Sequence, residues 1–278
     1  MIDEHFSAVS ILAGAALFSG MLAAVEIGAR RRGRAKERKE GHGSGIIESG
    51  VFAMLGLLIA LTFTGAAERI NDRAKLTIDE SDALGTAFLR LDVLSEPERE
   101  PTRRLLRDYT AARIEEYAHI RARAEHLASR ERTAALRDRL WSLAVAAAGR
   151  SRYPHAPQLT LPILNDAFDI AGRREAVRRI HPPAAVYLLL VMIGLLASLL
   201  AGYGLADADD RRWLHRLAFC SATAVAFFIT LNMEAPRHGF IRMGRRDLVL
   251  AETLAEMDRL LATRPGPGAG SPHRGPQP

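Results

Sequence analysis

Long apolar stretches alternate with strongly charged segments along this chain of 278 residues. Four of them approach the roughly 20 helical residues that cross a bilayer core: Phe6 to Ile27, Ser49 to Ala67, Ala184 to Leu205 and Trp213 to Met233. The pattern predicts an all-α, polytopic membrane protein with four transmembrane helices, two before and two after a helical extramembrane insert.

The second apolar stretch runs without a helix breaker into the charged segment Glu68 to Asp92, and the next proline is Pro97. We therefore expect one helix that leaves the bilayer. Beyond the apolar stretch, apolar and small side chains recur with a period of about 3.5 residues, which predicts that a partner helix covers them. This seam comprises Ile70, Ala74, Thr77, Ser81, Leu84, Phe88 and Leu91.

The rest of the insert also carries helical patterns. A second seam runs from Leu106 to Leu127 with one charged exception, Arg113, whereas the proline-rich segment Ser151 to Pro162 predicts a loop. Asp247 is placed to cap a last amphipathic helix. We expect five parts: transmembrane helices 1 and 2 with their basic loop (1–67), the insert (68–183), transmembrane helices 3 and 4 (184–234), a C-terminal amphipathic helix (235–263) and a disordered Pro/Gly tail (264–278).

Charge suggests how the chain lies in the membrane. The basic loop ARRRGRAKERKEGHGSG follows the first apolar stretch, and the positive-inside rule places it in the cytoplasm. With four transmembrane helices, two further groups of arginines fall on the opposite side of the membrane and favour the reverse orientation of the chain. The sequence therefore leaves undecided which side of the membrane holds the insert. These arginines are at 173, 174, 178, 179, 237, 242, 245 and 246. Arginine is abundant and lysine is confined to three positions, a bias typical of GC-rich bacteria, so we expect a bacterial inner membrane.

Several kinds of chemistry have no support in the sequence. Cys220 is the only cysteine, so no intramolecular disulfide and no cysteine-based zinc cluster is expected. The nine histidines form no HExxH motif, and neither GxSxG, a Walker A loop nor GxGxxG occurs. Asp79, Glu80 and Asp82 fit a solvated helix face better than a calcium site. We expect no enzyme activity and no catalytic, cofactor-binding or metal-binding residue, and the net charge of +6 is expected to meet lipid headgroups rather than nucleic acid.

Polar residues at the ends of the apolar stretches are candidates for a pore or for contacts that clamp the helices together. Glu26 and Glu48 lie beside the basic loop, where they either pair with arginine or border an ion path. Thr62 and Thr64 give the second helix a partly polar surface, which suits close helix packing or an aqueous path. At the other membrane face, charges that either cross-pair or select ions are Glu68, Arg69, Asn232, Glu234 and Arg237.

Four sequence segments, taken in order, resemble the bacterial bestrophin-like membrane proteins: VEIG, ESGVFAMLGLLIALTFTGAAERI, DALGTAFLRLD and LNMEAPRHGFIR. The resemblance covers nearly the whole chain outside the basic loop and the tail. It implies a relation to bestrophin anion channels, which are pentamers with four transmembrane helices per subunit and a pore lined by the second. The calcium clasp and the aromatic pore neck of bestrophins have no matching residues here, so no pore residue is carried over.

Two functions remain open. The first is a homo-oligomeric anion channel that assembles through the second helix and its extension, with the lipid bilayer and small anions as partners. The second is a non-conducting, membrane-anchored scaffold or sensor that uses the helical insert to bind an unknown partner. The absence of any charge from Ser49 to Ala67 favours the scaffold, and the seam on the emerging helix favours the channel.

Overall fold

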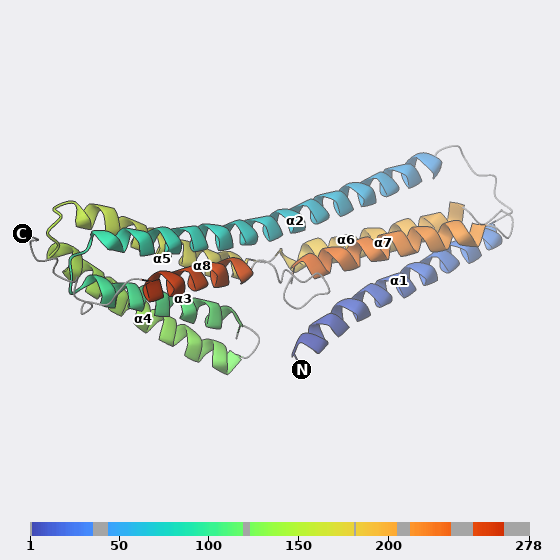
Figure 1. Ribbon diagram of the computed structural model, residues 1–278. Helices are drawn as coiled ribbons and strands as arrows, with labels where there is room; N and C mark the ends of the chain where they lie inside the picture. The colour runs from blue at the N-terminus through green and yellow to red at the C-terminus, as the bar shows by residue number, and fades with distance from the viewer. Residues whose placement is uncertain are drawn as a thin grey trace, which may run out of the picture. The chain divides into compact units, whose positions relative to one another are not determined.

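The computed structural model describes residues 2–35, 44–118, 123–180, 182–204, 212–234 and 247–263. Within these ranges the chain is helical and contains no strand, which confirms the all-α prediction. The elements are α1 (Ile2–Ala35), α2 (Ser44–Arg90), η1 (Leu91–Val93), α3 (Arg99–Ala118), α4 (Arg123–Gly149), α5 (Ala156–Arg179), α6 (Ala184–Gly204), α7 (Arg212–Glu234) and α8 (Asp247–Thr263) (Figure 1). The predicted tail at 264–278 and residues 36–43 of the basic loop lie outside the described residues.

The helices divide into two compact units. The membrane unit comprises Met1–Asp72 and Ile180–Met243, and the extramembrane unit comprises Arg73–Arg179 and Gly244–Pro278. Four helices, α1, α2, α6 and α7, are long and apolar enough to cross a membrane. Helix α2 is unbroken from Ser44 to Arg90 and belongs to both units, as the apolar stretch and the absence of a breaker predict.

In the membrane unit, α1 packs along α6 and α7, and side chains from all three helices form the core. Leu55 and its neighbours on α2 join that core, and Phe52 meets Phe219 of α7 edge to face, with ring centroids 5.5 Å apart. The face of α2 that carries Leu55 and Ile59 is therefore covered by the chain's own helices.

Helices α1 and α6 cross at two glycines. A Cβ atom added to Gly28 would lie 2.1 Å from the carbonyl oxygen of Leu199, and one added to Gly202 would lie 1.9 Å from the carbonyl oxygen of Val25. Both distances are far below van der Waals contact, so only hydrogen atoms fit at these positions. In a bilayer, small residues allow such close approach and the dispersion contacts that come with it.

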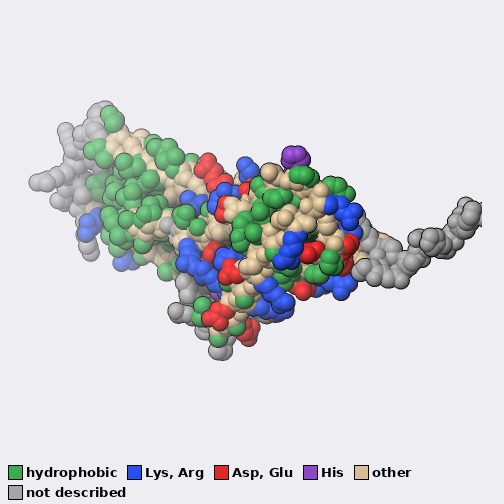
Figure 2. All heavy atoms as spheres, turned by 90° about the vertical axis from the view of Figure 1, so that its left-hand side faces the viewer, with side chains coloured by type: hydrophobic (Ala, Val, Ile, Leu, Met, Phe, Trp, Pro, Cys, Tyr) green, Lys and Arg blue, Asp and Glu red, His purple; other side chains and the backbone are tan. Residues whose placement is uncertain are grey.

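In the extramembrane unit, α3, α4, α5 and α8 pack around the second half of α2. Leu84, Phe88 and Leu91 are fully buried in its core, as the 3.5-residue seam predicts. Helix α8 supplies the expected partner, because the hydroxyl of Ser81 lies 2.6 Å from that of Thr253 and 3.2 Å from the carbonyl oxygen of Val249. On the face drawn in Figure 2, positive and negative side chains are interspersed over this unit, as expected for a surface in contact with water.

The predicted loop from Ser151 to Pro162 is wrong in its second half, because α5 already begins at Ala156. Pro157 lies in the first turn, where its missing N–H has no helical partner to lose. Pro162 lies inside the helix, where proline normally costs about 3 kcal/mol. The apolar side chains around it are drawn into the core, with Leu164 fully buried, and this packing overrides the local preference.

Candidate functional site

A buried network of charged side chains links three helices of the extramembrane unit. Glu80 of α2 lies at its centre, with one carboxylate oxygen 2.7 Å from Nε of Arg113 and the other 2.7 Å from a guanidinium nitrogen of Arg174. Arg113 also binds Glu116 at 2.9 Å and donates to the hydroxyl of Tyr117. We call these five residues the Glu80 network. Their formal charges balance, because two arginines face two glutamates.

The charged members of the network are almost entirely shielded from water. The exposed fraction of the side chain is 1% for Glu80, 6% for Arg113 and Glu116, and 8% for Arg174. Both guanidinium groups also lie over the ring of Tyr117, at 4.7 Å for Arg113 and 3.7 Å for Arg174, where the negative face of the ring stabilises them. Each partner thus offsets the desolvation of the others, which a buried ion pair requires.

The same surroundings shift two pKa values upward. Burial, followed by the negative charge of Glu80, raises the pKa of Tyr117 to about 12, so its hydroxyl remains protonated. Burial alone would lower the pKa of Arg113, but Tyr117 and Glu80 outweigh this effect and raise it. The two ion pairs of Glu80, with Arg113 and with Arg174, therefore hold α2, α3 and α5 together.

The sequence interpretation of Glu80 as part of a solvated acidic face is wrong. Asp82 is exposed, but Glu80 lies one turn after Thr77 and one turn before Leu84, and therefore on the buried seam. Arg113 was the charged exception in the second seam. Glu80 and Arg113 are opposite charges on two seams that face inward, and this pattern indicates a buried ion pair. No sequence pattern indicates that Arg174 joins them.

The candidates near the basic loop lie in two different environments. Glu26 is exposed on α1 and pairs with Arg30 one turn later, at 2.7 Å. Glu48 is half-buried near the start of α2, with its carboxylate beside Gly204, so that a Cβ there would lie 2.9 Å from Oε2. Glu26 thus pairs with an arginine, the first of the two roles considered for it. Glu48 packs against the end of α6.

The two threonines of the second transmembrane helix point to different sides. Thr62 is half-buried and donates its hydroxyl to the carbonyl oxygens of Leu58 and Ile59, at 2.8 and 3.0 Å. Thr64 is exposed. The two threonines, which the sequence analysis does not distinguish, therefore differ in the structure. Thr64 is the one on an uncovered surface.

The remaining candidates belong to the ends of the second and fourth apolar stretches of the sequence. Glu68 is exposed, and Arg69 folds back along its own helix, with a guanidinium nitrogen 3.2 Å from the position of a Cβ on Gly65. Asn232 is buried and donates to the carbonyl oxygen of Phe228 at 2.9 Å. Glu234 ends α7 but its side chain is not described, and Arg237 lies outside the described residues. The expected cross-pairing of these charges, as a bridge from Glu234 to Arg69 or from Glu68 to Arg237, therefore stays a prediction.

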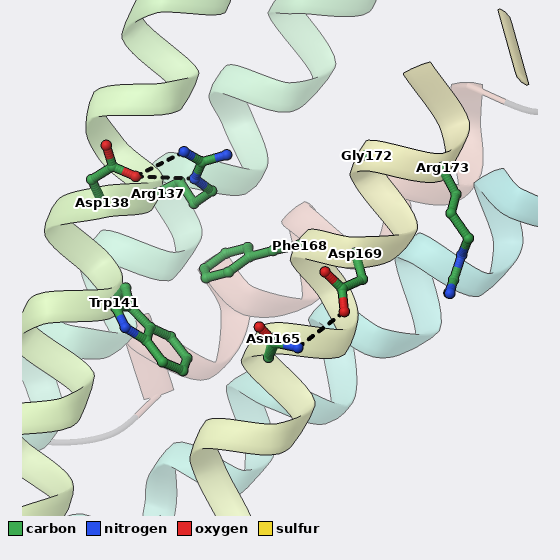
Figure 3. A pocket seen from close by; sticks show the side chains of 8 residues that line it. All are labelled: Arg137, Asp138, Trp141, Asn165, Phe168, Asp169, Gly172 and Arg173. Atoms are coloured by element: carbon green, nitrogen blue, oxygen red, sulfur yellow. Dashed lines mark hydrogen bonds and ion pairs between the residues drawn. The ribbon is translucent and has the colours of Figure 1, made fainter. Parts of the chain in front are cut away.

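One surface hollow of about 480 Å³ lies between α4 and α5. Figure 3 shows Phe168 and Trp141 in its wall, with Arg137 paired to Asp138 and Asn165 paired to Asp169 on its rim. These polar groups thus have their partners within the protein. Among the described residues, no cluster of three or more His, Cys, Asp or Glu side chains is arranged to hold a metal ion.

Comparison with known proteins identifies one family. The sequence profile described as the Bestrophin-like domain matches residues 5–248, which is most of the chain. No curated protein matches the chain, and no solved structure does.

Proposed function

Because the chain belongs to the Bestrophin-like domain family, we propose that it assembles into a homo-oligomer that conducts small anions between copies of α2. The proposed role is passive conduction and includes no chemical reaction. The observation that carries the proposal is a long surface of α2 that its own chain leaves uncovered.

This open face is defined by residues on the side of α2 opposite Leu55. In the most apolar part of α2, only 6% of the residues are buried by the rest of the chain. The corresponding share is 22% to 28% in the other three apolar helices. A Cβ on Gly56 would meet nothing within 4 Å, and Ala60 and Thr64 follow at intervals of four residues. Small side chains at this spacing suit close contact between membrane helices. The residues of the open face are Ala53, Gly56, Leu57, Ala60, Thr64 and Glu68.

The open face is polar only at one end. Thr64 offers a hydroxyl that is exposed, and Glu68 follows one turn later with an exposed carboxylate. Several copies of Thr64 around an axis would supply hydroxyl donors to a dehydrated anion, as pore-lining donors do in selective channels. A ring of Glu68 carboxylates would oppose anion entry, so in this proposal Glu68 limits the anion current.

Two measurements on the purified full-length chain test the proposal. The mass of the protein in detergent reports the assembly, and chloride efflux from liposomes reports conduction. Ala60→Phe on the open face is expected to disrupt the oligomer and abolish efflux. Ala222→Phe, at an exposed alanine of α7, is the matched control and should preserve both. A monomeric wild-type protein, or an oligomer without chloride efflux, would contradict the proposal.

The second candidate is a non-conducting scaffold or sensor. It is favoured by the absence of lysine and arginine from Ser49 to Ala67, since no positive charge within the apolar stretch of α2 attracts an anion. It predicts no chloride efflux, whether or not the chain assembles with copies of itself. The liposome measurement therefore separates the two candidates.

We place the protein in a bacterial inner membrane with the first loop in the cytoplasm, on the strength of its dense positive charge. The extramembrane unit then faces the outside. Replacing Cys220 by alanine and the exposed Asp82 by cysteine provides one labelling site in that unit. We expect a membrane-impermeant maleimide to label this cysteine in intact cells. A cysteine that is labelled only after lysis would show the opposite orientation.

A further inference from the structure

A second cluster of charges lies beside the Glu80 network and, unlike it, is not neutral. Glu175 of α5 binds Arg178 through both carboxylate oxygens, at 2.8 Å each, and binds Arg179 at 2.9 and 3.0 Å. Arg130 of α4 approaches the same carboxylate at 3.8 Å. We call these four residues the Glu175 cluster. Three guanidinium groups share one carboxylate, which leaves an excess of positive charge.

Glu116 of the Glu80 network also acts on Arg178. The two glutamates of that network are, however, already matched by Arg113 and Arg174. The arginines of the Glu175 cluster are partly open to solvent, with exposed fractions of 35% for Arg178, 59% for Arg179 and 47% for Arg130. Each guanidinium carries five N–H donors, so donors remain after the contacts with Glu175 are made.

The carboxylate also fixes where those donors are. Two side chains that would otherwise sample many rotamers are tied to Glu175 by four hydrogen bonds. Guanidinium groups held in this way match the oxygens of a phosphate group better than free lysine or arginine side chains do, because less entropy is lost on binding.

The cluster is close to the membrane by covalent connection alone. Arg179 precedes Ala184, the first residue of the apolar helix α6, by five positions, and five residues span at most about 18 Å. Headgroups extend beyond the hydrocarbon core, and electrostatic attraction reaches about 8–10 Å farther at physiological salt. Basic clusters next to a transmembrane helix attract anionic lipids in this way.

We propose that the Glu175 cluster binds the phosphate of an anionic phospholipid headgroup. Arg178 and Arg179 supply the donors, Glu175 positions them, and Arg130 adds charge from the neighbouring helix. The inference goes beyond conduction and does not depend on it, because it requires only a membrane protein with this cluster beside α6.

The test is a titration of the purified full-length chain, in neutral detergent, with fluorescent phosphatidylglycerol. Replacing Arg178 and Arg179 by glutamine is expected to weaken binding about 25-fold, or roughly fivefold for each charge. The matched control replaces Arg137 and Arg139 by glutamine, which removes the same charge from exposed positions on α4 and should weaken binding by less than twofold. Thermal unfolding in neutral detergent verifies that both variants are folded.

Two further arms determine the ligand. Phosphatidylcholine, which carries a phosphate but no net charge, is expected to bind at least tenfold more weakly than phosphatidylglycerol. Inorganic phosphate should compete only weakly. Equal losses in the two double variants, equal binding of both lipids, or inorganic phosphate binding as tightly as phosphatidylglycerol would each overturn the proposal.

Discussion

Glu80 and Arg174 are 94 residues apart in the chain, yet a carboxylate oxygen of the first lies 2.7 Å from a guanidinium nitrogen of the second. This contact joins α2, the helix that continues into the membrane, to α5, the helix that precedes α6. Both partners are buried in the extramembrane unit, so the pair exists only when that unit is packed. The contact therefore reports the folded state of the insert.

Replacing Glu80 by glutamine is expected to lower the free energy of unfolding by about 3–5 kcal/mol, because two buried guanidinium groups are then left with a single carboxylate, that of Glu116. Thermal unfolding of the purified protein, followed by circular dichroism, measures the effect. Asp82→Asn, an exposed acid two positions later on the same helix, is the control and should change the stability by less than about 0.5 kcal/mol. Equal stability of the two variants would show that the network does not hold the helices together.

Gly202→Ala is expected to destabilise the membrane unit by about 1–3 kcal/mol, because the added methyl group overlaps the backbone of Val25 and forces α1 and α6 apart. Gly194→Ala is the matched control on the same helix, since its Cβ would meet a methyl group of Thr223 at an ordinary 4.0 Å. Both variants are compared by thermal unfolding in the same detergent. A Gly202→Ala protein as stable as Gly194→Ala would contradict the close crossing.

Glu175 is expected to stabilise the fold at neutral pH and to lose that effect in acid. Burial opposes its ionisation, but hydrogen bonds from Arg178 and Arg179 outweigh burial and lower its pKa from 4.5 to about 2. A lowered pKa in the folded state contributes stability above pH 4.5 that disappears as the pH falls towards 2.

Because the Glu175 cluster is open to solvent, the contribution is about 1 kcal/mol. Unfolding of the wild type and of Glu175→Gln is compared from pH 7 down to pH 3. The stability difference between them should shrink as the pH falls, whereas Glu131→Gln, at an exposed acid of α4, should show no such convergence. A difference that stays constant with pH would exclude the arginine contacts as its cause.

Much of this fold is visible in the sequence, because its helices are long and their apolar positions are regular. The continuity of α2 follows from the absence of proline and glycine clusters between Ser49 and Asp92, and its buried seam follows from the 3.5-residue period. The sequence does not predict that α5 begins as early as Ala156. Prolines favour a loop there, but tertiary packing around Leu164 outweighs this local preference, and no local pattern reveals that packing.

The site was less accessible to sequence reasoning. The Glu80 network depends on contacts between residues that are 33 and 94 positions apart. In the sequence, each of its charged residues taken singly is therefore indistinguishable from a charged residue on a solvated helix face. Thr62 and Thr64 are both threonines in an apolar helix, and only the packing of α2 on its own chain shows which one is covered.

Removing the charge of Glu68 is expected to raise the anion current. If the open faces of α2 converge, a ring of carboxylates stands at the end of the proposed path and repels chloride. Chloride efflux from liposomes should therefore increase at least twofold for Glu68→Gln. Glu26→Gln, at an exposed acid of α1 that pairs with Arg30, serves as the control and should leave efflux unchanged. A lower efflux for Glu68→Gln would contradict this role.

The most direct test of the central claim, that the polar end of the open face of α2 borders a water-filled path, is thiol modification during chloride efflux. Thr64→Cys and Thr62→Cys are prepared in a Cys220→Ala background, so that each protein has one cysteine. A charged thiol reagent that does not enter lipid should reduce efflux through the Thr64→Cys protein by more than tenfold and leave Thr62→Cys unaffected. Efflux that is insensitive to the reagent in both proteins would contradict the claim.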